Sequence, residues 1–553
     1  SGSLGGKGRG VAFVNTLIHN FDFSNIIPNI RIRAPRTCIV GTDEFERFLD
    51  RNKLAEKILN ERDYTQIQQW FFEGTFSDVF VKRMRKVLKI IEKPIAIRSS
   101  GLFEDSRLQP FAGIFETYLL PNNHPDFEVR LKQALDAIKL VYASVYSKTA
   151  RGYVEAIHYK IEEEKMAVVI QEVVGEQYGD YFYPHISGVA QSYNYYPFAH
   201  MKPEEGFAVA ALGLGKYVVE GEKAYRFSPK YPDTDINTPR DQYLNSQLYF
   251  YAVDLSKRDI DLMEGDTAGL ARLDIDVAEE HGTLKHLASV YDLQMETIHP
   301  GLGRPGPRII NFANVLKYNY APMAKTIEVV LDIVQEALGS PVEIEFAIDL
   351  NKDKNYRSSF FVLQIKPLIG NLSDYTIDMD AIDREKLVLF SEKGMGNGLI
   401  DDICDLVYVE PSMFDKALTE KMAEEIELLN KKLVEEERRY ILIGPGRWGT
   451  RDRWIGIPVQ WAQISNAKII VETSLEGFPL DASSGSHFFH NVTSMNVGYF
   501  SVVEGIGKSF IDWDRLRSLK EVGRTTYFRH VRSEQPFTVK MDGKKRIAIV
   551  ATK

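Results

Sequence analysis

Residues 93–120 constrain this chain more than any other part of its sequence. The apolar run at residues 94–97 predicts a short buried strand, which ends in Arg98, Ser99 and Ser100. A small-residue turn follows at Phe111, Ala112 and Gly113. An arginine offers a planar fork of donors to phosphoryl oxygens, and a glycine turn lets backbone N–H groups approach them. The pattern therefore predicts a phosphate site at the strand end, with an ordinary strand end as the open alternative.

A second informative stretch covers residues 341–368 and predicts a β-hairpin. Apolar and polar residues alternate from Val342 onward, which is typical of a half-buried strand. One face of this strand carries Glu343 and Glu345, and the returning strand carries Gln364 and Lys366. Two carboxylates on one strand face are suitable ligands for Mg²⁺ when a nucleotide supplies further oxygens. The commoner alternative is an exposed face with solvated charges.

The chain opens on a glycine-rich segment, residues 2–10, which we expect to be a loop preceding a helix over residues 11–18. It contains Lys7 within the run Leu4-Gly5-Gly6-Lys7-Gly8. A flexible linker is the plain alternative. Because the chain opens on this segment without an initiating methionine, we expect a fragment of a longer protein.

These segments together resemble the nucleotide-binding domain of the phosphoenolpyruvate synthase and pyruvate phosphate dikinase family. Residues 97–119 have a counterpart for nearly every fixed position of the family pattern V-R-S-S-A-x-x-E-D-x-x-x-x-S-F-A-G-x-x-E-T-x-L. The segment around Lys7 matches its L-G-G-K-G motif, and residues 210–221 match G-L-G-E-x-V-V-x-G. The resemblance covers residues 1 to about 370, roughly two thirds of the chain.

The resemblance implies an ATP-grasp-type domain of two lobes that close on ATP and Mg²⁺. It assigns Lys7 and Arg98 to the phosphates and Glu343 and Glu345 to the metal, and it makes Lys366 catalytic. The residues that it places around the nucleotide are Lys7, Arg98, Ser99, Phe111, Ala112, Gly113, Thr117, Gln171, Glu172, Val174 and Gln364. Among these, the hinge at Gln171, Glu172 and Val174 would hold adenine.

Two residues depart from the family's acidic hairpin, D-x-E-W-A-x-D … L-Q-x-R-P. Glu343 replaces an aspartate and has a longer side chain. Lys366 replaces an arginine, which exchanges a bidentate fork for a point charge. The turn between the two strands is also longer than the family leads us to expect.

We predict a mixed α/β (α+β) protein with a two-lobed nucleotide domain and a smaller α/β domain. The expected divisions are an N-terminal lobe and hinge (1–250), an insertion (251–310), the acidic hairpin region (311–375), a helical linker (376–440) and a small α/β domain (441–553). Helical periodicity appears at residues 43–91, 127–159, 318–338 and 411–439, and strands are expected at 165–174, 440–443, 466–473 and in a closing hairpin at 537–550.

The C-terminal third raises the question of a phosphoryl carrier. The family's swivelling domain carries a histidine in a G-G-x-T-S-H-A-A turn, and Gly485-Ser486-His487 loosely resembles it. The alternatives are that His487 carries phosphate, or that His487 and His490 are structural or bind substrate. A basic and aromatic cluster, Arg447 to Trp454, is compatible with an anionic acceptor, with nucleic acid, or with a surface loop around buried tryptophans.

Composition limits the remaining function classes. The chain has 553 residues, a net charge of −9 with both signs interspersed, and no apolar run long enough to span a bilayer. We therefore expect neither a membrane span nor general nucleic-acid binding. Cys38 and Cys404 are the two cysteines, which favours a reducing compartment, and we expect a cytoplasmic protein.

We predict an ATP-dependent phosphotransferase. Full dikinases add a (β/α)₈ barrel of about 250 residues, whereas about 110 residues follow Tyr440 here. The acceptor should therefore be something other than pyruvate bound within this chain, or a partner chain. The competing interpretation is a non-catalytic ATP-binding module with a regulatory or assembly role.

Overall fold

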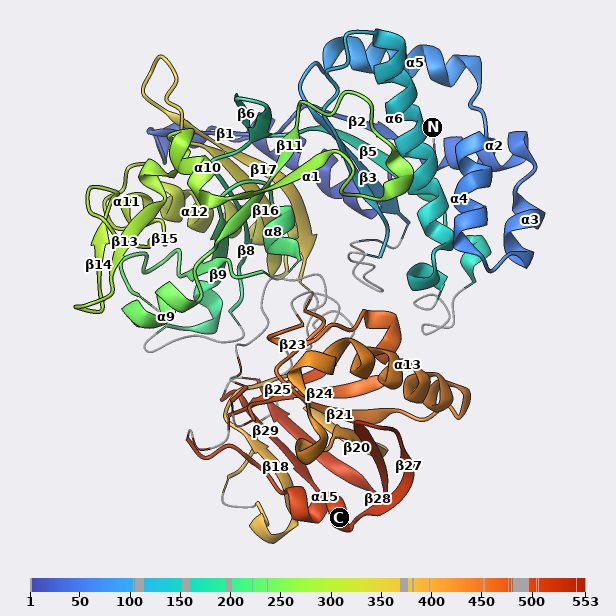
Figure 1. Ribbon diagram of the computed structural model, residues 1–553, viewed down its shortest axis with the longest axis vertical. Coiled ribbons are helices and arrows are strands. Elements are labelled where there is room, and N and C mark those ends of the chain that lie inside the picture. Colours follow the sequence, from blue (N-terminus) through green and yellow to red (C-terminus); the bar gives the residue numbers. More distant parts are fainter. Residues whose placement is uncertain are drawn as a thin grey trace.

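The computed structural model confirms a mixed α/β protein. It describes residues 2–102, 104, 114–151, 160–194, 201–220, 222–235, 237–368, 376–379, 382–396, 398–450, 453–475, 477–478, 480, 497–503, 505, 507–543 and 545–552. Two lobes lie side by side above a third, C-terminal domain (Figure 1). No helix of the described residues is long and apolar enough to cross a membrane.

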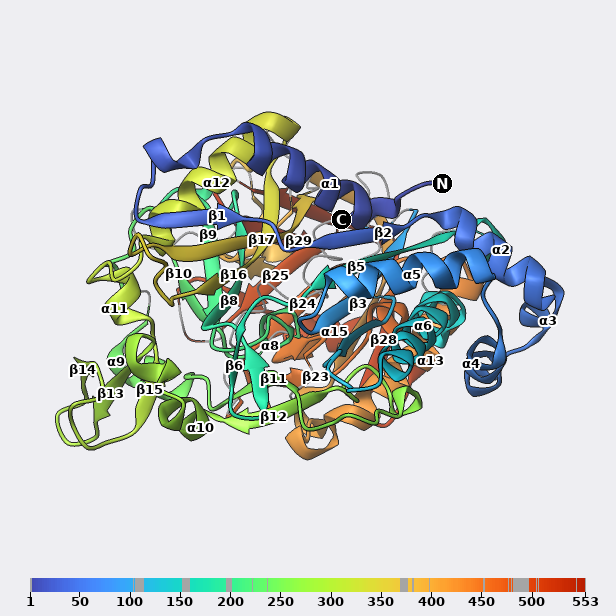
Figure 2. The ribbon, with the colours of Figure 1, turned by 90° about the horizontal axis from the view of Figure 1, so that it is seen from above.

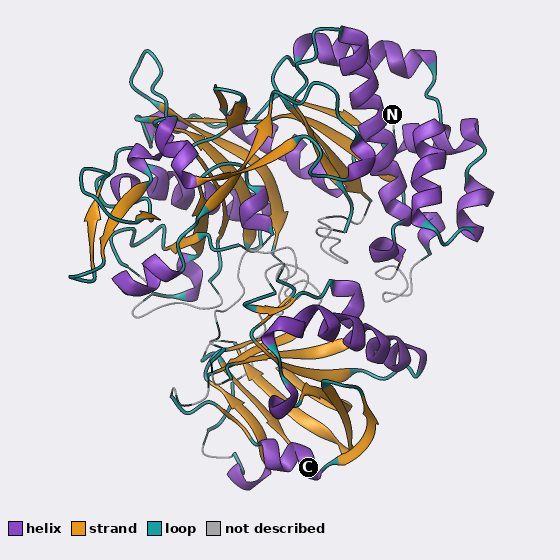
Figure 3. Cartoon of the chain, in the orientation of Figure 1, coloured by secondary structure: helices purple, strands orange, loops and turns teal. Residues whose placement is uncertain are grey.

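The first lobe, which we call the N lobe, is an antiparallel sheet covered by helices (Figures 1 and 3). Its described strands, in spatial order, are β2 (Thr37–Val40), β5 (Met166–Glu172), β3 (Ile95–Gly101) and β4 (Thr117–Leu120). The helices are α2 (Thr42–Asn52), α3 (Ala55–Asn60), α4 (Tyr64–Glu73), α5 (Asp78–Ile90) and α6 (Phe127–Ala143). The Asp126 carboxylate caps α6 by accepting the Glu128 N–H at 2.8 Å. The strand predicted at residues 94–97 is β3, which lies inside this sheet between β5 and β4.

The second lobe, the C lobe, is built on a larger mixed sheet. Its described strands, in order, are β1 (Ile30–Arg33), β17 (Ser358–Pro367), β16 (Val342–Asp349), β8 (Ile186–Gln191), β9 (Phe207–Ala211) and β10 (Tyr225–Phe227). The predicted acidic hairpin is β16–β17, in which Glu343 faces Lys366 and Glu345 faces Gln364. Helix α12 (Met323–Leu338) packs on this sheet with an apolar face, as its periodicity predicted.

Helix α1 (Gly5–Asn20) joins the two lobes, because it contacts both β3 and β17. This corrects the expectation of a glycine loop over residues 2–10, since the segment from Gly5 onward is helical. The glycines permit close packing. A Cβ on Gly5 would overlap the Ser100 carbonyl oxygen, and one on Gly10 would lie 2.8 Å from the Ile365 oxygen. The glycine motif thus serves the docking of a helix against two sheets.

The predicted insertion at residues 251–310 contributes strands to two small sheets, the first of which also includes strands from residues 176–183. One contains β12 (Leu270–Asp274), β11 (Tyr249–Asp254), β7 (Tyr181–Tyr183) and β6 (Glu176–Tyr178) among its described strands. The other contains β14 (Thr297–Pro300), β13 (Ala288–Asp292) and β15 (Arg308–Ile310). Short helices α8 (Lys216–Val219), α9 (Pro239–Leu244), α10 (Ile275–Glu280) and α11 (Ala313–Leu316) accompany them.

The C-terminal domain is one large sheet with a long helix on one side (Figures 1 and 3). Its described strands, in order, are β19 (Gly394–Met395), β25 (Gly498–Val502), β24 (Ala467–Thr473), β21 (Tyr440–Pro445), β20 (Gly398–Val409), β28 (Phe528–Asp542), β29 (Ile547–Ala551), β18 (Leu387–Ser391) and β26 (Phe510–Ile511), with β27 (Lys520–Arg524) beside β28. Helix α13 (Thr419–Glu435) lies on this sheet and α15 (Trp513–Ser518) is short.

The structure corrects the predicted helical linker at residues 376–440. Strands β18 and β20 lie inside that range and belong to the C-terminal sheet, so only α13 and short 3₁₀ turns are helical there. The reason is that β20 alternates weakly over its exposed first half and becomes fully buried in its second half, so it carries no uniform period-2 pattern. The predicted strands near residues 440 and 466 and the closing hairpin are present as β21, β24 and β28–β29.

Candidate functional site

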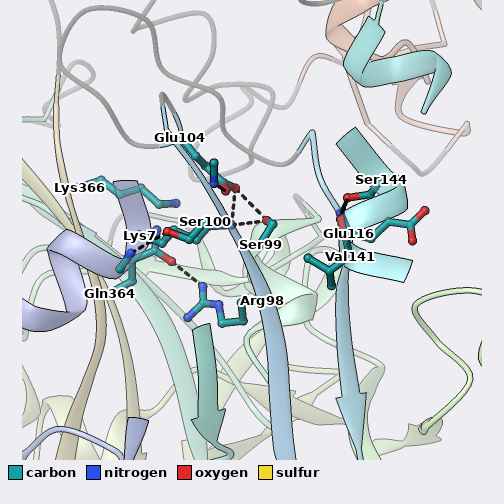
Figure 4. Close-up of polar contacts among 12 residues, drawn as sticks. Lys7, Arg98, Ser99, Ser100, Glu104, Glu116, Val141, Ser144, Gln364 and Lys366 are labelled. Carbon is teal, nitrogen blue, oxygen red and sulfur yellow. Dashed lines mark hydrogen bonds and ion pairs between the residues drawn. The ribbon is translucent and has the colours of Figure 1, made fainter. Parts of the chain in front are cut away.

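Arg98 connects the two lobes from the middle of β3, because this strand continues to Gly101, past the end that the sequence predicted. Its Nη1 donates to Gln171 Oε1 on β5 at 3.2 Å. Its Nη2 donates to Gln364 Oε1 at 2.5 Å (Figure 4). The same nitrogen donates to Glu345 Oε2 at 2.9 Å, and both acceptors lie on the hairpin of the C lobe. One guanidinium from the N lobe is therefore held by side chains of three different strands, which fixes its position between the lobes.

The acidic hairpin supplies a second cation and two carboxylates at the same place. Lys366 Nζ lies 2.9 Å from Glu345 Oε1 and 3.4 Å from Glu343 Oε1. Gln191 Nε2, from β8, donates to Glu343 Oε2 at 2.6 Å. Burial raises the pKa of the Glu343 carboxyl, and the nearby Lys366 opposes that rise. The solvated-face alternative is excluded for Glu343, which is only 4% exposed.

Lys7 forms a third charged group next to these residues. From the first turns of α1 its Nζ reaches Glu104 Oε1 at 2.5 Å and Ser99 Oγ at 3.2 Å (Figure 4). Glu104 has no exposed surface and also accepts the Gly101 N–H at 3.0 Å. The alternative of a flexible linker is therefore excluded for this segment, because Lys7 is 6% exposed and held in a buried ion pair.

A second buried carboxyl group, that of Glu164, lies near Glu104. Glu164, just before β5, is 2% exposed, and its Oε1 accepts the Leu102 N–H at 2.8 Å. Its Oε2 is buried and accepts no hydrogen bond among the described residues. Burial raises the pKa of Glu164 to about 8, and the nearby Glu104 adds to the rise.

Of the other residues that the sequence predicted for the site, three are described by the structure and four lie outside the described residues. Thr117 begins β4 and pairs with Arg98 across the sheet, while Glu172 ends β5 and donates its N–H to the Arg36 oxygen at 2.9 Å. Val174 follows and is buried. Phe111, Ala112, Gly113 and His487 lie outside the described residues.

Sequence reasoning missed three residues that the structure brings to this region: Glu104, Gln191 and Glu164. Glu104 was visible in the E-D pair of the quoted pattern, but nothing in the sequence marked it as the partner of Lys7, 97 residues away. Gln191 and Glu164 carried no signal, because they border apolar strands and owe their position to strand pairing.

A comparison with protein families identifies the first part of the chain. Residues 1–383 match the model of the pyruvate phosphate dikinase AMP/ATP-binding domain. The chain belongs to this family. The family's domain binds AMP or ATP, and the charged residues between the two lobes lie within the matched range.

Two curated proteins are similar at modest identity. An uncharacterized phosphotransferase, YvkC, of Bacillus subtilis is 24% identical over 369 residues, which is 66% of this chain and 34% of that protein. A phosphoenolpyruvate synthase of Deinococcus radiodurans is 27% identical over 213 residues, 34% of this chain and 24% of that protein. The chain thus spans about a third or less of the length of these relatives.

Proposed function

We propose that this chain is an ATP-dependent phosphotransferase that binds Mg²⁺-ATP between its N and C lobes. The observation that carries the proposal is the convergence of Arg98 from the N lobe with Lys366, Glu343 and Glu345 from the C lobe. It is supported by the family match and by the word phosphotransferase in the name of one relative. Phosphoryl transfer needs mainly positioning and charge neutralisation, which such a cluster provides.

The cluster is balanced in charge before any ligand binds. Three cations, Lys7, Arg98 and Lys366, are each paired with a carboxylate. The phosphate chain of ATP would compete with Glu345 for Arg98 and Lys366, because both acceptors are oxyanions. The carboxylates released in this exchange would then be available to a metal ion.

The donor set fits Mg²⁺ only together with the nucleotide. Among the described residues, no group of three or more histidine, cysteine or acidic side chains is arranged as a metal site. Glu343 and Glu345 offer two hard oxygen ligands on one strand, and phosphate oxygens would supply others. A bound Mg²⁺ would neutralise charge on the phosphates and on these buried carboxylates.

We propose an acceptor other than pyruvate bound within this chain, or a partner chain. His487 is the candidate carrier for a route through a phosphohistidine. Under the alternative, a regulatory ATP-binding module, the same cluster would bind nucleotide without turnover.

Product analysis by ³¹P NMR tests the proposal, with purified protein and Mg²⁺-ATP, first alone and then with a cell metabolite extract. AMP together with phosphate, and an acid-labile phosphoprotein lost in His487→Ala but retained in the control His299→Ala, would support a dikinase route through His487. ADP as the only new nucleotide would support a simple kinase. Bound ATP without turnover in any extract would refute the enzyme proposal and favour the regulatory module.

A further inference from the structure

A light green segment that follows β11 crosses from the C lobe to the N lobe in Figure 1, and the view from above shows the same crossing (Figure 2). It consists of residues 255–269, which form the tip of the β11–β12 hairpin and which we call the strap. Lys257 Nζ donates to the carbonyl oxygens of Ala268 and Leu270, at 3.1 Å in each case. The two ends of the strap are thereby held together, so the strap is a compact unit.

The stem of the strap is attached to the C lobe by backbone hydrogen bonds. Strand β11 pairs with β12 and also with β7, which lies shortly before β8 in the chain. Leu214, just after β9, donates its N–H to the Tyr251 oxygen at 2.9 Å. Within the strap, the Asp266 carboxylate accepts a hydrogen bond from Lys216 Nζ of α8 at 2.9 Å. The C lobe therefore holds the stem and one side of the strap.

The other side of the strap contacts the N lobe through two amide side chains. Asn123, after β4, donates from Nδ2 to the Leu255 oxygen at 2.7 Å. Gln133 of α6 donates from Nε2 to the Arg258 oxygen, also at 2.7 Å. Because both bonds end on backbone oxygens of the strap, they depend on where the strap lies and not on its side chains.

Apolar packing completes the contact between the strap and the N lobe. Leu262 and Ala268 are 4% and 6% exposed, and they belong to the same hydrophobic core as Leu131 of α6. A Cβ on Gly269 would overlap the Leu119 oxygen of β4, so the strap and this strand approach each other closely. Separating the lobes along this surface would expose the two apolar side chains to water.

The contact with the N lobe is the weaker of the two attachments of the strap. Among the described residues, no strand pairing joins the strap to the N lobe. A like charge also opposes this contact, since burial raises the pKa of the Glu116 carboxyl, just before β4, and the nearby Asp266 adds to the rise. Segments with few paired backbone groups open at a lower free energy than paired strands. The strap should therefore leave the N lobe and stay on the C lobe.

The strap connects the lobes independently of the charged site. Under the proposed function, phosphate oxygens replace Glu345 as the partner of Arg98, which removes one contact between the lobes. The bonds from Asn123 and Gln133 end on the strap and lie outside that exchange. With nucleotide bound, the strap would continue to hold the two lobes together.

We propose that the strap has to leave the N lobe before the lobes separate, and that this release sets the rate at which nucleotide leaves the site between them. Release breaks the bonds from Asn123 and Gln133 and exposes Leu262, while the β11–β12 stem stays paired on the C lobe. Opening of such a segment limits product release in many enzymes. The inference rests on the proposed function, because that function places the nucleotide between the lobes.

The test compares two double variants of the full chain. Asn123→Ala with Gln133→Ala removes both amide donors to the strap. The matched control, Asn60→Ala with Gln69→Ala, removes the same residue types from α3 and α4, where each side chain bonds within its own helix. Hydrogen exchange at residues 255–269 measures release of the strap, and stopped-flow displacement measures dissociation of a fluorescent non-hydrolysable ATP analogue. We expect both rates to rise at least fivefold in the first variant and to match the wild type in the control.

Two outcomes would overturn the inference: equal exchange of the strap in the two variants, or faster exchange with unchanged dissociation of the analogue. Melting temperatures show whether each variant is folded, and Asn123→Ala alone, at an exposed position, replaces a double variant that is not. A wild type that binds no analogue would contradict the proposed function and, with it, the role in nucleotide release. Hydrogen exchange would still decide whether the strap is held on the N lobe, so the two failures are distinguishable.

Discussion

Replacing Glu345 by glutamine should separate the binding of free ATP from the binding of Mg²⁺-ATP. Glu345 pairs with Arg98 and with Lys366, at 2.9 Å in each case, and its side chain is 12% exposed. In the wild type, metal-free ATP has to compete with this carboxylate for both cations. Glu345→Gln keeps the size of the side chain and removes the competing charge. Free ATP should therefore bind more tightly, although a residue of the site has been lost.

The magnitude follows from the charges. Two unit charges about 4 Å apart interact by roughly 4 kcal/mol at an effective dielectric constant of about 20. Relaxation of the side chains and entry of water reduce this, so we expect a gain of about 1–3 kcal/mol, which is roughly 5- to 150-fold in affinity. Under the proposed function, in which Glu345 is a ligand of Mg²⁺, turnover of Mg²⁺-ATP should fall at least about hundredfold.

Isothermal titration calorimetry with ATP in EDTA, and then in Mg²⁺, measures both effects. Asp349→Asn is the matched control, since Asp349 lies on the same strand but pairs with His185 at 3.3 Å. The reasoning would be refuted if Glu345→Gln bound metal-free ATP more weakly than the wild type or with unchanged affinity. Either result would mean that Glu345 does not compete with phosphate for the two cations.

Three further predictions concern stability. Glu164 has a pKa of about 8 in the folded state, above its ordinary 4.5, so between these pH values the folded state retains a proton that the unfolded state has lost. The unfolding free energy should therefore fall by roughly 4 kcal/mol between pH 4.5 and 8. Urea titrations across that range should show a smaller pH dependence for Glu164→Gln. Gly5→Ala should lower the unfolding free energy by more than about 1 kcal/mol, because φ is 69° and the new Cβ overlaps a backbone oxygen of β3. The control Gly303→Ala should be neutral, because its new Cβ meets nothing within 4 Å. Equal urea unfolding midpoints for the two variants would contradict the docking of α1. Asp405→Ala should lower the unfolding free energy by about 3–5 kcal/mol, because it leaves two arginines and His530 without the buried carboxylate that they share. The change at the exposed Asp402, Asp402→Ala, should stay within about 1 kcal/mol. Calorimetry of both variants measures the difference.

The sequence by itself determined several local elements of the nucleotide domain. The alternation in β16 and the apolar run in β3 depend on neighbours along the chain, so their strands could be predicted without a structure. Arg98, Glu343 and Glu345 were found for the same reason, since each lies in a short motif at fixed spacing. The resemblance to a family then supplied their common context, and the family match agrees with it.

Only the tertiary structure decided which of these residues meet. Lys7 and Glu104 are 97 positions apart, and Arg98 and Gln364 are 266 apart, so no local pattern records their pairing. The glycine-rich start was expected to be a loop, because the low helix propensity of glycine is a local property. This segment folds as α1 because two sheets pack against it so closely that a Cβ at Gly5 or Gly10 would meet their backbone oxygens.

The C-terminal domain shows the same division more strongly. Its strands β18 and β20 were missed within a predicted helical linker. β18 and most of the second half of β20 are buried on both faces, and such strands lose the alternation by which a strand is recognised. The Arg447–Trp448 turn was visible as a basic and aromatic cluster, but its burial over the end of β21 comes from Glu472 and Tyr499, which follow later in the chain. Sequence patterns report what neighbouring residues have in common, whereas a binding site is formed by residues that only folding brings together.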